Sequence, residues 1–244
     1  MTTKTILISG GSSGLGAALV TAYLAQGHRV ATFSRKHNAF IAAQQAHDQQ
    51  AAHFYWEALD AEDSASLAPW VARVQQHFGT VDVLINNAAK LSEGLLAFTS
   101  DQDIHALIQC NLVAPIILTK ACSTAMLRQN SGVILNISSI NAIRGHKGVA
   151  LYSASKAALD GLTRSLAREL GPANIRINAL APGFFETDLV AYLSPERRQQ
   201  IRKRTPLNRL GQLADVSQLA QFMCSDAASF LTGQTIVLDG GMTC

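Results

Sequence analysis

The sequence lacks the features that would tie the protein to nucleic acid or to a membrane. Its formal net charge is only +3, and it has no run of Lys or Arg long enough for a nucleic-acid-binding tail. No apolar run approaches the roughly 20 residues of a membrane span. The first apolar run begins almost at once, near Lys4, which leaves no room for a secretion signal. We therefore expect a soluble, cytoplasmic protein.

Metal-binding patterns and aromatic residues are also scarce. The four cysteines, at 110, 122, 224 and 244, lack the CxxC and CxxH spacings of zinc sites, and the histidines show no ligand spacing. We expect reduced thiols, mostly buried, and no metal site. Aromatic residues make up only 6% of the 244 residues, whereas apolar residues reach 48%. Such a chain is long and apolar enough for one substantial core.

What the sequence does contain is a regular alternation of short apolar runs and longer segments with helical periodicity. The runs are rich in β-branched residues and predict strands at 5–9, 29–34, 53–58, 81–86, 133–138, 176–181 and 235–239. The helical segments between them lie near 15–26, 38–49, 63–78, 101–129, 151–171 and 213–225. This order predicts a single α/β domain over 1–244, with a doubly wound (Rossmann) seven-stranded parallel sheet between two layers of helices.

One segment interrupts the alternation between the last two strands. Residues 184–210 contain a helical stretch, 194–204, in which Pro195 suits the first turn of a helix. We expect this insertion to form a lid over a site. The stretch carries the densest basic cluster, for which a solvated helix face and a binding surface are both open. The cluster consists of Arg197, Arg198, Arg202, Lys203 and Arg204.

The first predicted strand ends in a glycine-rich turn, SGGSSGLG, which leads into the first helix. Its glycines form the pattern G-x-x-x-G-x-G, which permits a tight turn and the close approach of a pyrophosphate to the helix N-terminus. We expect the turn to bind a dinucleotide, although a purely structural turn is an alternative. The expected contacts are Gly10, Ser12, Ser13, Gly14, Leu15 and Gly16.

The second predicted strand lacks an acidic residue at its end, where enzymes that prefer NAD usually hold the ribose hydroxyls. The chain instead reads Ser34-Arg35-Lys36 at this point. Because a guanidinium pairs well with a phosphate, Arg35 favours NADP(H) over NAD(H). The alternative is a solvated loop arginine.

Tyr152 and Lys156 stand about one helical turn apart in YSASK, and Ser139 precedes them by thirteen positions. The pair therefore projects from one helix face, where an ammonium can stabilise a phenolate. An unperturbed tyrosine has a pKa of about 10, and we expect the nearby cation to bring the pKa of Tyr152 closer to neutrality. We interpret Tyr152 as the catalytic acid of a reaction at a carbonyl or alcohol.

Together these patterns resemble the short-chain dehydrogenase/reductase family, from residue 4 to the C-terminus. SGGSSGLG is similar to the family's T-G-x-x-x-G-x-G, with Ser9 in place of threonine, and NNAA at 86–89 is similar to N-N-A-G. The order and spacing of the motifs make the match specific. The other matching positions are Asn111, Ser139, Tyr152, Lys156, Pro182, Gly183 and Thr187.

The resemblance implies a role for each catalytic residue. Tyr152 would transfer the proton, and Ser139 would hydrogen-bond the substrate oxygen as charge develops there. Lys156 would act on the pKa of Tyr152 and hold the nicotinamide ribose. Asn111 would hold a water that links Lys156 to solvent.

The resemblance also implies further cofactor contacts and an assembly. Asp60 would contact the adenine amine, and Asn87 would lie beside the adenosine ribose. Phe185 and Thr187 would line the nicotinamide side. For Asp60, a helix N-cap is the alternative, although Asp63 or Ser64 fits that role better. The family further implies a homotetramer.

Within the family, the C-terminal third is most similar to 3-oxoacyl-[acyl-carrier-protein] reductases. The similarity lies in PGFFETDL, LSPERRQQIRKRTPLNRLG and SDAASFLTGQTIVLDGGM. It implies NADPH-dependent reduction of a 3-oxoacyl thioester on an acyl carrier protein, in a fatty acid or polyketide type pathway. The basic residues with which such reductases dock the carrier are replaced by Asn130 and Ala173, whereas Arg128 and the basic cluster remain available for docking.

Two other functions stay open at this point. One is an NADP-dependent dehydrogenase of a free small alcohol, sugar or polyol, and the remote one is a non-catalytic dinucleotide sensor. The loop before Tyr152 bears on the substrate, because it carries His146 and Lys147. We expect these side chains either to touch substrate or only to solvate the loop.

Overall fold

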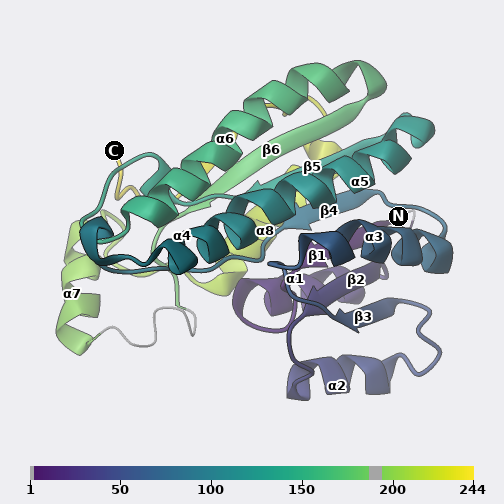
Figure 1. The fold of residues 1–244 in the computed structure, drawn as a ribbon, viewed down its shortest axis with the longest axis horizontal. Helices are drawn as coiled ribbons and strands as arrows, with labels where there is room; N and C mark the ends of the chain where they lie inside the picture. The colour runs from purple at the N-terminus through teal and green to yellow at the C-terminus, as the bar shows by residue number, and fades with distance from the viewer. Residues whose placement is uncertain (1–2, 187–193) are drawn as a thin grey trace.

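The computed structural model describes residues 3–186 and 194–244, in which seven strands form one parallel sheet (Figure 1). The strand order is β3-β2-β1-β4-β5-β6-β7, so the direction of winding changes between β1 and β4. In such sheets, ligands bind beyond the carboxyl ends of the strands at this change. The strands are β1 (Thr5–Ser9), β2 (Arg29–Ser34), β3 (Phe54–Ala58), β4 (Val83–Asn86), β5 (Gly132–Ile137), β6 (Ile175–Pro182) and β7 (Thr235–Leu238).

Helices cover both faces of the sheet, which explains why the strands read as nearly continuous apolar runs. Successive strand residues alternate between two hydrophobic clusters: Ile6 and Ile8 belong to one, and Leu7 belongs to the other. The helices that pack on the first cluster are α1 (Gly14–Ala25), α2 (Ala39–His47) and α8 (Leu213–Cys224). Those on the second are α3 (Ser64–Phe78), α5 (Ala114–Gln129) and α6 (Ala150–Leu170).

This architecture confirms the predicted doubly wound α/β fold. The predicted strands and helices are present, and their ends differ by at most two residues from those observed. Short 3₁₀ turns, which the sequence analysis did not predict, lie at Leu96–Phe98, Ile140–Ala142, Gly171–Ala173 and Asp226–Ala228.

The predicted helix over 101–129 is present, but its hydrogen bonding is not regular throughout. α4 (Asp101–Ile108) passes through a π-helical turn at Gln109–Val113 before α5 begins. Such turns insert an extra residue into a helix and are frequent at functional sites. Asn111 lies in this turn and is fully buried. The turn therefore decides which way Asn111 points, and helical periodicity does not reveal it.

The same segment is long and apolar enough to cross a membrane, and it is the one such helix in the described part of the chain. Its mean hydropathy reaches 1.4, but 56% of the apolar window is buried inside the protein. Leu118, Cys122 and Met126 of α5 belong to the core cluster. The apolar character of the segment thus serves packing within the domain.

Between β6 and α8 the chain leaves the sheet and forms α7 (Pro195–Arg204), as the sequence predicts (Figure 1). Pro195 lies in the first turn, and the Ser194 hydroxyl accepts a hydrogen bond from the backbone N of Arg197 at 3.2 Å. After α7, the backbone N of Leu207 donates to the carbonyl of Gly240 at 3.2 Å. The C-terminal residues therefore hold the chain that follows the C-terminus of α7.

Candidate active site

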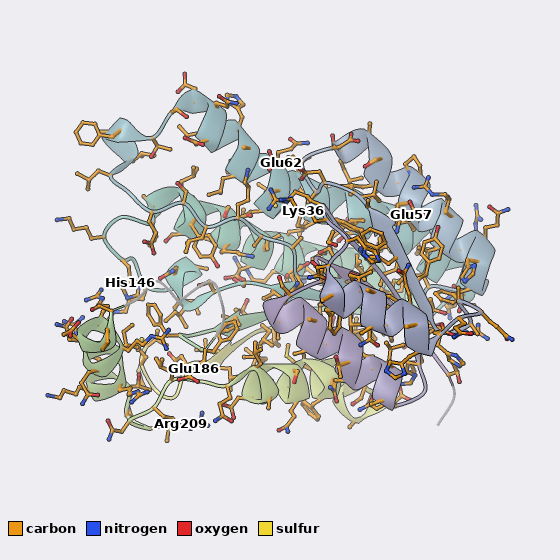
Figure 2. The ribbon with its side chains drawn as sticks, turned by 90° about the horizontal axis from the view of Figure 1, so that it is seen from below. Lys36, Glu57, Glu62, His146, Glu186 and Arg209 are labelled. Atoms are coloured by element: carbon orange, nitrogen blue, oxygen red, sulfur yellow. The ribbon has the colours of Figure 1, made fainter. Side chains whose placement is uncertain are left out.

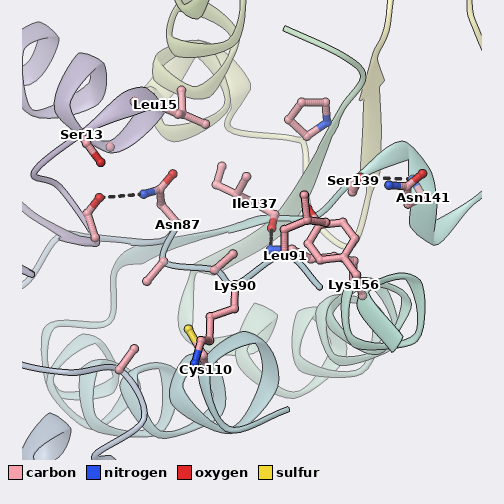
Figure 3. Close-up of a pocket in the computed structure, with 18 of the residues that line it drawn as sticks. Ser13, Leu15, Asn87, Lys90, Leu91, Cys110, Ile137, Ser139, Asn141 and Lys156 are labelled. Carbon is pink, nitrogen blue, oxygen red and sulfur yellow. Dashed lines mark hydrogen bonds between the residues drawn. The ribbon is translucent and has the colours of Figure 1, made fainter. Parts of the chain in front are cut away.

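The carboxyl ends of the strands open into a cavity with a volume of about 1160 Å³ (Figure 3). Its wall includes residues that directly follow six different strands. This is the place that the strand order predicts for a dinucleotide. These residues are Gly10, Arg35, Leu59, Asn87, Ser138 and Gly183.

The glycine-rich turn forms one end of the cavity. Gly10 and Gly14 have φ values of +71° and +52°, which favour glycine. A Cβ on Gly16 would stand 2.1 Å from the carbonyl oxygen of Gly10, so this position must also be glycine. Ser13 is the N-cap of α1, but its side chain makes no capping hydrogen bond. The uncapped N-terminus of α1 suits a pyrophosphate.

Ser9 joins this turn to the loop after β4. Its hydroxyl oxygen accepts hydrogen bonds from the backbone N atoms of Asn87 and Ala88, both at 2.9 Å. The Asn87 amide in turn donates to the carbonyls of Ser9 and Gly10 at 3.0 and 3.1 Å (Figure 3). These bonds fix the two loops that border the cavity. The Ser9 hydroxyl thus provides the hydrogen bonds that the hydroxyl of the family's threonine could provide at this position.

Arg35 and Lys36 lie in the cavity wall directly after β2, and both are exposed. Neither forms an ion pair with a described residue. Two cations are therefore available where the sequence predicts a 2′-phosphate, although the sequence analysis assigned only Arg35. Asp60 also lines the cavity, and its carboxylate accepts a hydrogen bond from the backbone N of Glu62 at 3.0 Å. The N-cap of α3 is Asp63, as expected.

The predicted catalytic residues meet at the other side of the cavity. Figure 3 shows Ser139 across from Ser13, with Asn87 between them. Ser139 follows the end of β5, and Tyr152 and Lys156 project from one face of α6. The Lys156 Nζ atom lies 5.8 Å from the centroid of the Tyr152 ring. It donates a hydrogen bond to the carbonyl oxygen of Ile137 at 2.7 Å.

Burial controls the pKa values of this pair. It raises the pKa of Tyr152, and the neighbouring Ser139 hydroxyl opposes that rise. Burial also lowers the pKa of Lys156 to about 8. The expectation that Lys156 brings the Tyr152 pKa toward neutrality is therefore wrong for this structure. Desolvation disfavours the phenolate, and the lysine ammonium is directed to the Ile137 carbonyl.

Asn111 is held away from the cavity wall by its own hydrogen bonds. Its Oδ1 accepts from the backbone N of Lys90 at 2.7 Å, and its Nδ2 donates to the Lys90 carbonyl at 2.9 Å. Nδ2 also contacts the Ser155 hydroxyl at 3.1 Å. The side-chain amide thus ties the π-helical turn to the loop after β4 and to α6. Its link to Lys156 through a water stays a prediction.

A second tie across the cavity escaped the sequence analysis. The Lys90 Nζ atom forms an ion pair with the Glu62 carboxylate at 2.6 Å, and both residues line the cavity. The pair joins the loop after β3 to the loop after β4. Because the partners are 28 residues apart and lie in different loops, no local sequence pattern predicts this ion pair.

The remaining predicted positions can now be placed. Phe185, His146 and Lys147 line the cavity, whereas Thr187 lies outside the described residues. Free thiols at Cys110, Cys122, Cys224 and Cys244, three of them buried, confirm the expectation for cysteine. The described residues contain no group of three or more potential metal ligands. Cavity residues that the sequence analysis missed include Ser34, Leu91, Cys110, Val149, Phe184 and Ile201.

Comparison with known proteins agrees with this geometry. A family model described as Enoyl-(Acyl carrier protein) reductase matches residues 10–243. The protein is 35% identical over 239 residues to the 3-oxoacyl-[acyl-carrier-protein] reductase FabG of Escherichia coli, with 98% of this chain and 97% of the relative covered. The chain belongs to the short-chain dehydrogenase/reductase family. The FabG protein of Staphylococcus aureus is also 35% identical, over 242 residues and 98% of each chain.

Solved structures of other short-chain dehydrogenases/reductases share the fold over almost the whole chain. A putative short-chain alcohol dehydrogenase from Sinorhizobium meliloti superimposes with a TM-score of 0.92 at 29% identity, covering 99% of this chain and 97% of that one. A short-chain dehydrogenase/reductase from Serratia marcescens gives a TM-score of 0.90 at 27% identity, covering 99% and 98%. The protein is therefore an oxidoreductase of this family that acts on carbonyl or hydroxyl groups.

Proposed function

We propose that the protein uses NADPH to reduce the ketone of a 3-oxoacyl thioester to a secondary alcohol. The observation that carries the proposal is the convergence of Ser139, Tyr152 and Lys156 at one side of a cavity whose other side is a glycine-rich, uncapped helix N-terminus. The proposed carrier of the thioester is an acyl carrier protein, in a fatty acid or polyketide type pathway. Support for this substrate comes from the 35% identity to 3-oxoacyl-[acyl-carrier-protein] reductases.

The described residues fit a nicotinamide dinucleotide phosphate. The glycine turn would hold the pyrophosphate, and Arg35 with Lys36 would hold the 2′-phosphate. Asp60 would accept a hydrogen bond from the adenine amine, and Asn87 would border the ribose. Phe185 would line the nicotinamide side, with Thr187 as a further proposed contact. When bound, this cofactor supplies a hydride.

The chain's own residues handle the substrate oxygen and the proton. The Ser139 hydroxyl would donate to the carbonyl oxygen as negative charge develops there, and Tyr152 would deliver the proton. Because the phenol pKa is raised, Tyr152 is protonated at neutral pH and is ready to act as an acid. Lys156 would hold the nicotinamide ribose. Asn111 fixes the surrounding loops and would support the return of a proton from solvent.

Two further properties belong to this proposal. We place the enzyme in the cytoplasm, and we expect a homotetramer. Large apolar side chains at the α8–β7 end support assembly, because the relative exposure of Phe230 is 105% and that of Phe222 is 48%. We also propose that α7 acts as part of a lid, since Arg197 and Ile201 of this helix line the cavity.

A panel of initial rates tests the function directly. Purified protein would be supplied with NADPH or NADH and with acetoacetyl or crotonyl thioesters, and in the reverse direction with NADP and simple secondary alcohols or polyols. We expect the highest kcat/KM for NADPH with acetoacetyl thioesters. Every other combination of cofactor and substrate should give a kcat/KM at least tenfold lower. Turnover confined to free alcohols would contradict the proposed substrate. Turnover of crotonyl thioesters alone would indicate an enoyl reductase.

A further inference from the structure

Two cations from separate elements line the substrate end of the cavity. Arg197 lies in the first turn of α7, Lys147 lies in the loop before α6, and both are exposed. Arg197 Nη1 donates to Gln200 Oε1 at 3.2 Å, within its own helix. Neither cation forms an ion pair with a carboxylate of the described chain. By contrast, carboxylates lie 2.6 to 2.8 Å from Lys4, Arg73, Lys90 and Arg209.

The surroundings show that these cations belong to the mouth of the site. His146, next to Lys147, has its ring centroid 6.5 Å from that of Phe184, and both residues line the cavity; Figure 2 labels His146. The loop is fixed by a hydrogen bond from the backbone N of Gly94 to the carbonyl of Gly148 at 2.8 Å. Glu93, an acidic residue, lies in the same cavity wall, which also includes Asp60 and Glu62.

The wall near these cations is mostly apolar. Its side chains come from the loop after β4, the start of α6, the chain after β6, and α7. A matching ligand would place a reactive carbonyl near Tyr152, an extended uncharged arm along the apolar wall, and an anion next to the two cations. The apolar residues are Leu91, Leu95, Val149, Phe184 and Ile201.

We propose that Arg197 and Lys147 form a subsite for the phosphate group of a phosphopantetheine thioester. The inference rests on the proposed function and adds the part of the substrate that the mouth recognises. A guanidinium pairs with phosphate oxygens through two N–H groups, and a lysine adds a point charge. In coenzyme A this phosphate is part of a diphosphate, and in a loaded acyl carrier protein it is a diester with the carrier, so both keep a negative charge at the end of the pantetheine arm. The subsite binds the phosphate, and other residues would bind the surface of the carrier protein.

The test compares acetoacetyl thioesters that differ in the arm. Rates of NADPH oxidation would be measured with the thioesters of pantetheine, 4′-phosphopantetheine, coenzyme A and a loaded acyl carrier protein. We expect kcat/KM for phosphopantetheine to exceed that for pantetheine by about fivefold to tenfold at low salt, as a partly exposed charged contact allows. The ratio should fall as salt is added. A kcat/KM that is higher with only one of coenzyme A and the carrier protein than with phosphopantetheine would show that this ligand makes contacts beyond the phosphate.

Variants assign the effect to the two cations. In Arg197→Gln combined with Lys147→Gln, the preference for phosphopantetheine should disappear, because kcat/KM with the phosphopantetheine thioester falls to the value with the pantetheine thioester. Lys203→Gln is the matched control, because Lys203 lies on α7 but is not part of the cavity wall. It should retain the preference. A preference that survives in the double variant would overturn the assignment.

The failure of this inference is distinguishable from failure of the proposed function. Equal kcat/KM for pantetheine and phosphopantetheine thioesters would overturn the phosphate subsite but leave thioester reduction intact. Absence of turnover with every thioester, together with turnover of free alcohols, would overturn both. Loss of NADPH affinity in the double variant would show that the cations serve the cofactor instead.

Discussion

The ammonium of Lys156 lies 2.7 Å from the carbonyl oxygen of Ile137, and its hydrogen bond goes to the end of β5. The side chain is only 2% exposed. A buried cation with one carbonyl partner is costly, which is why the pKa of Lys156 falls to about 8. The residue is therefore placed for function at the expense of the stability of the folded protein.

Lys156→Met should make the protein more stable while abolishing turnover. The pKa of this lysine is about 8 when folded against 10.5 in the reference state, so the unfolded chain binds more protons between these values. The contribution of Lys156 to stability thus rises with pH across that window, and its burial is unfavourable below pH 8. We expect a gain on the order of 1–3 kcal/mol at pH 7, less whatever the lost hydrogen bond contributed. Thermal unfolding at pH 7 and pH 10 measures it.

The gain should shrink at pH 10, where the lysine is largely neutral when folded. Lys203→Met on α7 is the control, because Lys203 is exposed and should change little at either pH. A Lys156→Met protein that melts lower than the unmodified protein at pH 7 would contradict the cost of burial argued here.

Tyr152→Phe should leave NADPH binding intact and reduce turnover by about 10² to 10⁴, because it removes only the transferable proton. NADPH binding by fluorescence and single-turnover reduction of an acetoacetyl thioester would be measured on the same samples. Near-normal reduction by this variant would require another proton donor, and the mechanism would be wrong.

Ser139→Ala should lower turnover and also shift the pH dependence of alcohol oxidation. The Ser139 hydroxyl holds the Tyr152 pKa down, so its removal raises that pKa further. Oxidation needs the phenolate as base, and its pH profile should therefore move to higher pH. The profile of kcat against pH measures the shift. A profile that is unchanged, or that moves to lower pH, would show that Ser139 does not lower the pKa of the Tyr152 phenol.

Gly16→Ala should disrupt the dinucleotide turn. The added Cβ would meet the Gly10 carbonyl oxygen at 2.1 Å and the Asn87 amide nitrogen at 2.7 Å, both of which are fixed by hydrogen bonds. We expect a loss of about 1–3 kcal/mol in the free energy of unfolding and at least tenfold weaker NADPH binding. Gly161→Ala in α6 is the control, since nothing beyond the backbone of its own helix lies within 4 Å of its added Cβ, and it should stabilise by about 0.5–1 kcal/mol. Equal behaviour of the two variants would refute the steric argument.

Arg35→Asp should reduce or reverse the preference for NADPH. It replaces a phosphate partner by a carboxylate that repels phosphate and accepts hydrogen bonds from ribose hydroxyls. Lys36 stays in the cavity wall, so a residual affinity for NADPH is expected, and Arg35→Asp with Lys36→Ala should remove it. The ratio of kcat/KM for the two cofactors is the measurement. Equal use of both cofactors by the unmodified enzyme would remove the basis of this prediction.

The sequence by itself determined the order of strands and helices, the glycine turn and the spacing of Tyr152 and Lys156. These features depend on local periodicity and on the conformations that glycine permits, and neighbouring residues are enough to specify them. The parallel, doubly wound sheet followed from the alternation, because right-handed crossovers leave few other arrangements.

Only the tertiary structure decided the π-helical turn around Asn111, the ion pair between Lys90 and Glu62, and the direction of the Lys156 ammonium. Each depends on groups that lie far apart along the chain and meet only when the loops pack together. The pKa of Tyr152 shows the reason most clearly: the sequence predicted a cation close to the phenol, whereas folding buried both groups and gave the cation another partner. Desolvation depends on everything that surrounds a side chain, and no local pattern in the sequence encodes it.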